Sequence, residues 1–574
     1  MLSNFGGRLS YHRRLFLQLR IINLRAQIET ARARSSLNFH TDWLLLGGFC
    51  AFVFFYGLSN FGLIGADEPR YAQIAREMLA RHDWVTPVLG GESWLEKPPL
   101  FYWQAMIAYS IFGVSDWAAR LPSAADATLM VIVIYFFSRR FLRGVELDAA
   151  LIAASTAGVI GFSRAASTDM PLAAMFTIAM LGWYAWYESK AGSYLAGAYV
   201  FLGLAALAKG PVALLLAAAI VGLFAAVRRD YKLLWRTLWV PGIVIFLMVT
   251  LPWYIAVQVK NPDFFHIFIV EHNLARFGTN LYHHKQPFWY FIPVTLLALV
   301  PWAVLACVSL ARDIRRWRAD QGNSAHDLSS FLLVWLLVPV IFFSASESKL
   351  PGYILPAVPA GALLVARYLY RHLSSEDGLP LPVIILHSIV AAAPIVLALM
   401  IQYIVMQHQL PWGKATAISC TFAAILALAL AFTLRSRIGS GGIRFTLVPV
   451  ALGVAAVLRL GAPALESTLS ARPIANEISR MDKQGLPLAV FRVPREVEYG
   501  LAFYRNQKIE QYRLGEIPAE AHLLVAPEGS QVEIAELLPG RRVSYLGSYA
   551  PRGLDYYWIA ASSQHSAISS QPPR

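Results

Sequence analysis

The chain has 574 residues, of which 57% are hydrophobic and only 15% are charged. Soluble proteins carry about 25% charged residues, so this composition excludes an ordinary soluble protein and predicts an α-helical polytopic membrane protein. The formal net charge of +14 comes from 49 basic and 35 acidic side chains. The basic residues fall in short loops, as the positive-inside rule expects, so this charge does not indicate a nucleic-acid partner.

The N-terminal segment, residues 1–41, holds seven arginines and a single acidic residue, Glu29. It is too polar for a cleaved signal peptide, and we predict a basic cytoplasmic arm. The apolar run Trp43–Ile64 follows and is long enough to cross a bilayer, which takes about 20 residues. The next segment is therefore predicted to lie on the outer face of the membrane.

That first outer loop, residues 65–116, opens with Asp67-Glu68-Pro69-Arg70 and carries Glu96-Lys97-Pro98-Pro99 further along. Apolar residues recur at helical spacing after the first cluster, which predicts an amphipathic helix lying along the membrane surface. A second interfacial helix is predicted at Leu100–Phe112, because this run is short for a span. Only Trp117–Phe137 then crosses the membrane and returns the chain to a basic cytoplasmic loop.

Apolar runs and basic loops alternate through the predicted transmembrane domain, residues 42–465, and give about thirteen spans. An odd number of crossings places the C-terminus outside the cytoplasm. The later predicted spans are 147–163, 170–187, 194–208, 210–227, 237–258, 289–311, 329–345, 352–370, 383–405, 415–434 and 445–463.

Residues 466–574 have the composition of a soluble domain. Short apolar runs predict strands and helical patterns fall between them, so we predict a small α/β domain on the outer side. It holds no phosphate-cradling Gly-rich loop, and no nucleotide cofactor is predicted. The predicted strands are Leu488–Val493, His522–Ala526, Val543–Tyr549 and Tyr556–Ala561, and the predicted helices are Ile474–Lys483 and Gln531–Leu538.

The remaining polar motifs all fall on the predicted outer side. They are Arg164–Pro171, Lys209–Pro211, the loop Lys260–Pro287 and Ser344–Tyr353. Outward-facing bases oppose the usual charge bias, so they indicate an anionic partner such as a phosphate or diphosphate headgroup. The bases that suit this role are Arg70, Lys97, Lys209 and Lys349.

Carboxylates among such bases suit transfer at a sugar carbon. In this interpretation Asp67 accepts a proton from an attacking hydroxyl or stabilises an oxocarbenium-like centre. Aromatic residues suited to stacking on sugar rings lie nearby, although for most of them the aromatic belt of a membrane protein is the preferred interpretation. These aromatic residues are Trp84, Trp94, Tyr102, Trp103, Trp253, Tyr254, Trp289 and Tyr290.

Several ordered motifs resemble a known family. The runs ADEPRYAQIAREML, HDWVTPVLGGESWLEKPPLFYW and FGVSDWAARLPSA resemble bacterial aminoarabinose transferases and protein mannosyltransferase-like glycosyltransferases. SRAASTDMPL, LAKGP, EHNLARF and SKLPGYILP follow in the family's order, so the resemblance covers about residues 42–370. It implies an inverting enzyme of the GT-C fold that takes a sugar from a polyprenyl-phosphate donor on the periplasmic side of the bacterial inner membrane.

The resemblance also implies roles for individual residues. Asp67 matches the catalytic carboxylate and Asp169 a second acid of the same cavity. Arg70 and Lys97 match residues that hold the lipid phosphate, and Lys349 and Tyr353 match a loop closing over it. Further substrate contacts are predicted for Lys209, Glu68, Tyr71 and Arg164.

Glu96 and His272 resemble positions associated with a divalent ion, zinc or similar, in the aminoarabinose enzymes. Two ligands do not complete a zinc site. A structural hydrogen-bonding pair is the alternative interpretation for them.

The sequence therefore predicts a membrane glycosyltransferase that uses a polyprenyl-phosphate-linked sugar. Its acceptor stays open among a lipid (lipid A-like), a glycan and a protein, and so does the oligomeric state. The alternative prediction is a transporter or flippase of a lipid-linked sugar, for which charged residues near the middle of the bilayer on broken helices are expected.

Overall fold

The structure, a computed structural model, describes residues 40–275, 286–319, 327–373, 379–405, 412–436, 444–482 and 484–562. The chain divides into two units, residues 1–52 and 53–574. In the first unit, described residues 40–52 belong to an apolar helix, His40–Phe55. The predicted basic arm lies outside the described residues apart from its last two positions.

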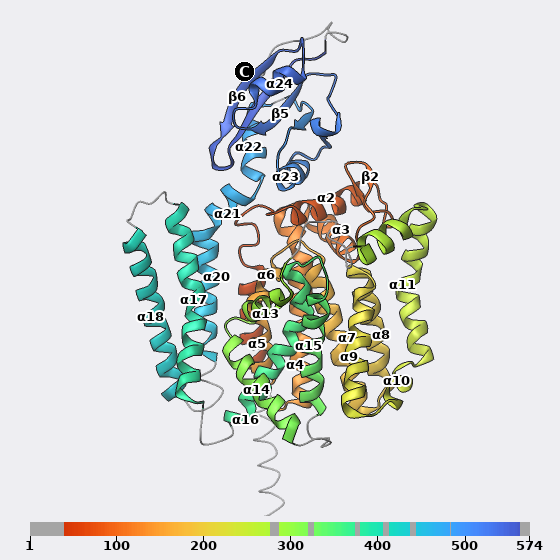
Figure 1. Cartoon of the computed structure of the whole chain (residues 1–574), viewed down its shortest axis with the longest axis vertical. Helices are drawn as coiled ribbons and strands as arrows, with labels where there is room; N and C mark the ends of the chain where they lie inside the picture. Colours follow the sequence, from red (N-terminus) through yellow and green to blue (C-terminus); the bar gives the residue numbers. More distant parts are fainter. Residues whose placement is uncertain are drawn as a thin grey trace, which may run out of the picture. The chain divides into compact units, whose positions relative to one another are not determined.

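The second unit is mostly helical (Figure 1). Its first helices are α2 (Asp67–Ala80), α3 (Leu100–Phe112), α4 (Asp116–Phe141), α5 (Glu146–Ala154), α6 (Ala157–Ser163), α7 (Asp169–Ser189), α8 (Gly192–Lys209), α9 (Val212–Arg228), α10 (Lys232–Thr237), α11 (Val240–Lys260) and η2 (His266–Ala275). Next come η3 (Phe288–Tyr290), α13 (Phe291–Ala298), α14 (Ala303–Ala319), α15 (Asp327–Ser344), η5 (Pro351–Ala357), α16 (Val358–Leu373), α17 (Leu381–Val405), α18 (Trp412–Ser436), α20 (Leu447–Ala456), η6 (Val457–Gly461) and α21 (Ala462–Leu469).

Helix α7 occupies the core of the helical region. It packs against α4 and α8, and it is buried along most of its length. A helix that is apolar on all sides is typical of a protein core or of a membrane span, and α7 is covered by its neighbouring helices. The first residue of this buried helix is Asp169, so the core fixes the position of that carboxylate.

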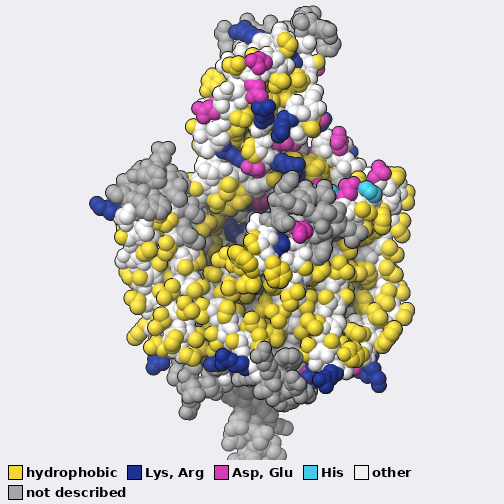
Figure 2. All heavy atoms as spheres, in the orientation of Figure 1, with side chains coloured by type: hydrophobic (Ala, Val, Ile, Leu, Met, Phe, Trp, Pro, Cys, Tyr) yellow, Lys and Arg dark blue, Asp and Glu magenta, His cyan; other side chains and the backbone are white. Residues whose placement is uncertain are grey.

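Eight helices of the described residues are long and apolar enough to cross a membrane, or up to ten if each of two bent pairs is one span. Figure 2 shows hydrophobic side chains covering the middle of the visible face, with lysines and arginines gathered at one end of this band. The chain is therefore an integral membrane protein. The predicted number of about thirteen spans stays a prediction, because two of its members, the helix His40–Phe55 and α9, are shorter apolar helices.

Two predicted spans are broken. The span predicted at 147–163 consists of α5 and α6, bent by 62°, and the span predicted at 289–311 is bent by 116° before α14. The two breaks pack together: the Ala157 N–H donates to the Val300 carbonyl (2.7 Å), and the Trp302 indole N–H donates to the Ser155 hydroxyl (2.8 Å). Such pairing supplies the hydrogen bonds that irregular backbone needs where water is absent.

The span predicted at Trp43–Ile64 is helical only to Phe55. Gly57 has a positive φ of 67°, which favours glycine and turns the chain out of the helix. The segment that follows leads to the predicted pair of surface helices, α2 and α3. These two pack against each other and are connected through the hairpin of β1 (Val88–Leu89) and β2 (Glu92–Ser93).

The predicted C-terminal α/β domain is confirmed as a five-stranded sheet of order β4-β3-β5-β7-β6. Strands β4, β3 and β5 are parallel to one another, whereas β7 runs antiparallel to both of its neighbours, β5 and β6. Helices α22 and α23 pack on one face of the sheet and α24 on the other. The bounds are α22 (Arg472–Met481), β3 (Leu488–Val490), α23 (Arg495–Arg505), β4 (Ile509–Gln511), η7 (Tyr512–Leu514), β5 (His522–Pro527), α24 (Gln531–Leu537), β6 (Val543–Tyr549), η8 (Ala550–Arg552) and β7 (Leu554–Ile559).

Candidate functional site

The site is built around the first turn of α2. Asp67 and Arg70 lie one helical turn apart, and the guanidinium of Arg70 donates to the Asp67 carboxylate at 2.5 Å. The Asp67 side chain is 56% exposed, whereas that of Arg70 is 12% exposed. The predicted catalytic acid is therefore open to a substrate, while its basic partner is set into the protein.

Three aromatic rings surround the Arg70 guanidinium. Its central carbon lies 5.0 Å from the ring centre of Tyr71, 5.4 Å from Trp94 and 5.8 Å from Tyr499. The carboxylate of Glu96 lies 4.0 Å from its Nη1 atom. Burial by itself lowers the pKa of Arg70, but Tyr71 and the carboxylates of Asp67 and Glu96 hold it above its usual range. The site thus contains a permanent, half-enclosed positive charge.

Tyr71 lies at the centre of the cluster. Burial raises the pKa of its phenol, and the negative charges of Asp67, Asp169 and Glu96 raise it further. Its hydroxyl therefore keeps its proton and accepts a long contact of 3.4 Å from Arg70. Because three carboxylates from different segments act on one phenol, the fold brings these predicted residues into one electrostatic neighbourhood.

A second predicted group joins this neighbourhood from the ends of α7 and α8. Lys209, the last residue of α8, forms an ion pair with Asp169, the first residue of α7. The Lys209 ammonium also lies 4.9 Å from the ring centre of Tyr353. A Cβ atom on Gly352 would be 2.7 Å from the Asp169 carboxyl carbon, so this glycine permits the first turn of η5 to approach the carboxylate.

Glu68, predicted as a substrate contact, has contacts that favour a structural role. Its carboxylate accepts from the guanidinium of Arg120 at 2.6 and 3.0 Å and from the backbone N–H groups of Ile64 (2.8 Å) and Ala166 (2.7 Å). Arg120 is fully buried and also donates to the carbonyls of Leu58, Phe61 and Gly62. This pair fixes the segment that leads into α2.

Three other predicted bases have different surroundings. Lys97 is half-buried in the turn directly after Glu96. The buried ammonium of Lys349 donates to the carbonyl of Ser346 in its own loop. Arg164 donates to the carbonyls of Val53 (3.0 Å) and Tyr56 (2.8 Å), so its described contacts hold backbone in place. The substrate roles of these bases stay predictions.

The predicted metal ligands do approach each other. The Nε2 atom of His272 lies 3.8 Å from the Glu96 carboxylate, on which Arg70 also acts. Within the described ranges no group of three or more His, Cys, Asp or Glu residues is arranged to hold a metal ion. These two residues do not by themselves fit a zinc site, which needs at least three protein ligands, so we assign no step to a metal. Arg276, His283 and His284, in the motifs of the same loop, lie outside the described residues.

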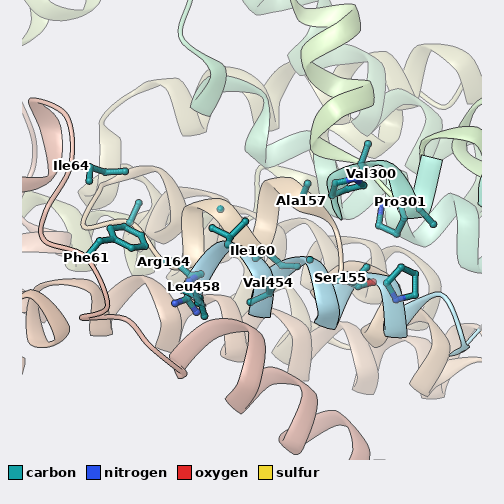
Figure 3. A pocket seen from close by; sticks show the side chains of 18 of the residues that line it. Phe61, Ile64, Ser155, Ala157, Ile160, Arg164, Val300, Pro301, Val454 and Leu458 are labelled. Carbon is teal, nitrogen blue, oxygen red and sulfur yellow. The ribbon is translucent and has the colours of Figure 1, made fainter. Parts of the chain in front are cut away.

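An apolar cavity of about 400 Å³ reaches the start of α2. Figure 3 shows Phe61, Ile160, Val454 and Leu458 along it, with Arg164 among them. The two helix breaks contribute to its wall, and Glu68 also lines it. Glu68 belongs to α2, so the cavity reaches the helix that carries Asp67 and Arg70. A polar site beside an apolar cavity suits a substrate with a charged head and a hydrocarbon tail.

Sequence reasoning missed two residues of this region. Arg120 stands inside the motif DWAARLPSA, where a basic residue in an apolar helix is itself a signal of a special role. Tyr499 lies on α23, which was not predicted. The spacing of Val497, Leu501 and Tyr504 is helical and is a signal for that helix, but nothing local indicates that Tyr499 reaches Arg70.

Proteins with similar sequences are known. Residues 44–268 match the family model described as dolichyl-phosphate-mannose-protein mannosyltransferase. The undecaprenyl phosphate-alpha-4-amino-4-deoxy-L-arabinose arabinosyl transferase of Yersinia enterocolitica is 34% identical over 331 residues, which are 56% of this chain and 58% of the relative. The protein of that name from Pseudomonas paraeruginosa is 33% identical over 358 residues, 60% of this chain and 62% of the relative. The matches thus span about three fifths of these relatives' length.

Solved structures extend the similarity to most of the chain. The crystal structure of ArnT from Cupriavidus metallidurans bound to undecaprenyl phosphate has a TM-score of 0.73 at 23% identity and covers 90% of this chain and 97% of its own. Its apo form gives a TM-score of 0.74 at 22% identity, with 90% and 98% covered. These matches confirm the predicted GT-C fold, and the sequence matches confirm the resemblance to the two transferase families.

Proposed function

We propose that this chain is an inverting glycosyltransferase that moves a sugar from a polyprenyl-phosphate donor to a lipid, glycan or protein acceptor. One observation carries the proposal: the exposed carboxylate of Asp67 contacts the Arg70 guanidinium at 2.5 Å, and the Glu96 carboxylate lies 4.0 Å from the same guanidinium. The ion pair of Asp169 with Lys209 is close enough for Asp169 to raise the pKa of Tyr71, the neighbour of Arg70. The relatives are named as transferases of a sugar from undecaprenyl phosphate and the matching family model is described by dolichyl phosphate, and both support the same donor class.

In this proposal the donor's charged and apolar parts occupy different places. Its phosphate lies against Arg70 and Lys97, because guanidinium and ammonium groups form strong charge-assisted hydrogen bonds with phosphate oxygens. The apolar cavity beside α2 accommodates hydrocarbon, either the start of the donor's isoprenyl chain or the tail of a lipid acceptor.

The chemical step is a displacement at the anomeric carbon. An acceptor oxygen forms the new C–O bond on the face opposite the phosphate, and the bond to the polyprenyl phosphate breaks, so the configuration inverts. The electron pair of that bond leaves with the phosphate, whose growing charge Arg70 stabilises. If the acceptor is a hydroxyl, its proton passes to the exposed carboxylate of Asp67. If the acceptor is a phosphate, there is no proton to remove and Asp67 positions the reacting groups.

We further propose that the chain works in the bacterial inner membrane with this site on the periplasmic side. The distribution of charge among the loops supports this orientation. The plain arginine and lysine clusters, such as those that end α4 and α9, belong to the loops predicted to be cytoplasmic, while the mixed acid and base motifs lie in the others.

The alternative, a transporter of a lipid-linked sugar, is less well supported. Charged residues are expected at helix breaks in transporters, but Ser155 and Val300 mark the two breaks here, whereas Asp169 and Lys209 lie at helix ends. Asp126 is buried within α4, yet its carboxylate accepts two hydrogen bonds of 3.0 Å from the Gln104 amide. These contacts describe a packed polar pair between two helices.

The stereochemistry of the product tests the proposal. Purified protein in lipid nanodiscs is given a polyprenyl-phosphate sugar of known anomeric configuration together with a phosphorylated lipid, a glycan or a peptide. The proposal predicts a glycosylated product from one acceptor class, with the configuration inverted. A product that retains the donor's configuration contradicts the displacement, and unchanged donor with every acceptor contradicts the transferase.

A further inference from the structure

The C-terminal domain docks onto α2 through α23. Arg76 of α2 donates to the Phe503 carbonyl at 2.9 Å. The Tyr504 hydroxyl accepts from the Leu63 N–H at 2.6 Å and donates to Asp116 at 2.5 Å. These contacts lie directly before the first outer loop, within it and at its last residue, so α23 is held against the site.

An ionic contact strengthens the same docking. Arg472, the first residue of α22, donates to Asp116 at 2.8 Å and to Glu466 at 2.7 Å. Glu466 in turn accepts from the Gly62 N–H at 2.6 Å. Because two helices of the domain share Asp116 as a partner, the domain is anchored at more than one point.

Tyr499 lies one turn before Phe503 on α23 and reaches the candidate site. Its ring centre is 5.8 Å from the central carbon of the Arg70 guanidinium. It also meets Trp94 edge to face, with ring centres 6.5 Å apart and planes at 78°. Tyr499 and Trp94 therefore form a continuous aromatic wall next to Arg70, and one half of this wall comes from the C-terminal domain.

We propose that Tyr499 is a positioning residue for the donor site: its ring, together with Trp94, holds the Arg70 guanidinium in the orientation that receives the donor phosphate. This inference rests on the proposed function of Arg70. It gives the C-terminal domain a part in donor binding, which the motif resemblance, confined to about residues 42–370, does not indicate.

The physical reason is the mobility of an arginine side chain. A free guanidinium on a flexible stem must be ordered when it binds a phosphate, and this ordering weakens binding. Aromatic faces attract the cation and restrict it beforehand. Within the described part of the chain the Tyr499 hydroxyl makes no hydrogen bond, so the ring rather than the hydroxyl is expected to matter.

Three variants of the full-length protein test this role. Tyr499→Leu removes the aromatic ring and Tyr499→Phe keeps it. The control Tyr545→Leu changes an exposed tyrosine of β6 in the same domain. We expect Tyr499→Leu to raise KM for the polyprenyl-phosphate sugar by roughly three- to tenfold with kcat changed less than about twofold, as for the loss of one cation–π contact. Tyr499→Phe and Tyr545→Leu should match the wild type.

A second readout follows Arg70 without turnover. Modification of Arg70 by phenylglyoxal, measured by mass spectrometry, should be faster in Tyr499→Leu than in Tyr545→Leu. Equal KM and equal Arg70 reactivity in these two variants overturn the inference. If the wild type transfers no sugar while Arg70 reactivity still rises, the proposed function fails but the positioning of Arg70 by Tyr499 stands. If thermal unfolding shows that Tyr499→Leu is not folded, Trp94→Leu and Trp94→Phe are used in its place. KM is then expected to rise in Trp94→Leu with kcat little changed, and both constants should match the wild type in Trp94→Phe.

Discussion

Lys209 and Asp169 form an ion pair that joins the end of α8 to the start of α7. Each partner is also favoured where it stands, because a cation suits a helix C-terminus and an anion suits a helix N-terminus. The ring of Tyr353 lies beside the ammonium group. Asp169, Lys209 and Tyr353, which belong to three motifs far apart in the sequence, thus lie together. Substitutions here test directly whether this contact matters for activity.

Replacing Lys209 by methionine keeps the length of the side chain and removes its charge. Asp169 then loses its charged partner in a half-buried place, where such a bond contributes about 1.5–3 kcal/mol. We expect kcat/KM to fall by roughly 10- to 100-fold. The measurement is initial-rate kinetics with purified protein.

Lys260→Met is the matched control for that change. Lys260 pairs with Asp83 at 3.0 Å, but its side chain is 51% exposed, and exposed pairs contribute at most about 1 kcal/mol. Its kcat/KM should stay close to the wild-type value. Equal losses in the Lys209 and Lys260 variants contradict a functional role for the buried pair.

Gly352→Ala should disturb Asp169 without a change of charge. The added methyl group would be 2.7 Å from the Asp169 carboxyl carbon, so the carboxylate or the loop must move. We expect activity to fall at least about tenfold, since small displacements at a reacting centre have large effects on rate. Gly222→Ala on α9, where a Cβ meets nothing within 4 Å, is the control. Wild-type activity in Gly352→Ala argues that the position of Asp169 is not critical.

Substitutions of the sequence neighbours Asp67 and Glu68 should differ in their effect on thermal stability. Glu68→Ala leaves Arg120 buried without its carboxylate, and breaking a buried pair costs about 3–5 kcal/mol. We therefore expect a markedly lower melting temperature for Glu68→Ala in detergent and little change for Asp67→Asn, whose side chain is 56% exposed. A stable, inactive Glu68→Ala protein would instead indicate that Glu68 acts on the substrate.

The C-terminal domain should lose stability in weak acid. Burial lowers the pKa of His522 from 6.5 to about 4. The Nε2 atom of its ring forms a hydrogen bond of 2.5 Å with the Tyr512 hydroxyl. Between these two pH values the unfolded chain binds the proton and the folded protein does not. The free energy of unfolding is therefore fully present above pH 6.5 and falls as the pH drops toward 4.

The double variant Tyr512→Phe/His522→Leu tests that pH dependence. It removes the titrating imidazole of His522 together with the Tyr512 hydroxyl that is bonded to it. Arg541 still donates to the Glu520 carbonyl at 3.0 Å. Thermal unfolding of full-length protein from pH 7.5 to pH 4.5 should show a smaller loss in the variant than in the wild type. Parallel curves for the two proteins contradict a role for His522.

The sequence was sufficient for the local parts of the site. The spacing of Asp67 and Arg70 predicts that both lie on one side of a helical turn, and the structure shows their contact. The first surface helix of the outer loop also follows from periodicity, the second from the shortness of its apolar run, and four strands of the C-terminal sheet from their short apolar runs. These features depend on neighbours in the chain, which a sequence pattern contains.

Features that depend on distant packing were not predictable in this way. Tyr499 reaches Arg70 only because α23 docks on α2, and no local pattern in the sequence indicates that contact. The breaks near Ser155 and Val300 stabilise each other across two helices, whereas the sequence of each reads as one apolar span. Glu68 looked like a substrate residue because its partner Arg120 lies fifty-two positions away.

The release of polyprenyl phosphate from a labelled donor is the most direct measurement of the central claim. Wild-type protein and Asp67→Asn are mixed with a donor labelled in both its sugar and its lipid, with the acceptor in excess, in a single turnover. We predict that the wild type releases one polyprenyl phosphate for each sugar transferred. Asp67→Asn should bind the donor but turn it over roughly 10²- to 10⁴-fold more slowly if the acceptor is a hydroxyl, as for the loss of a general base. Sugar that stays attached to its lipid while crossing a sealed vesicle membrane, with no polyprenyl phosphate released by the wild type, would contradict the claim.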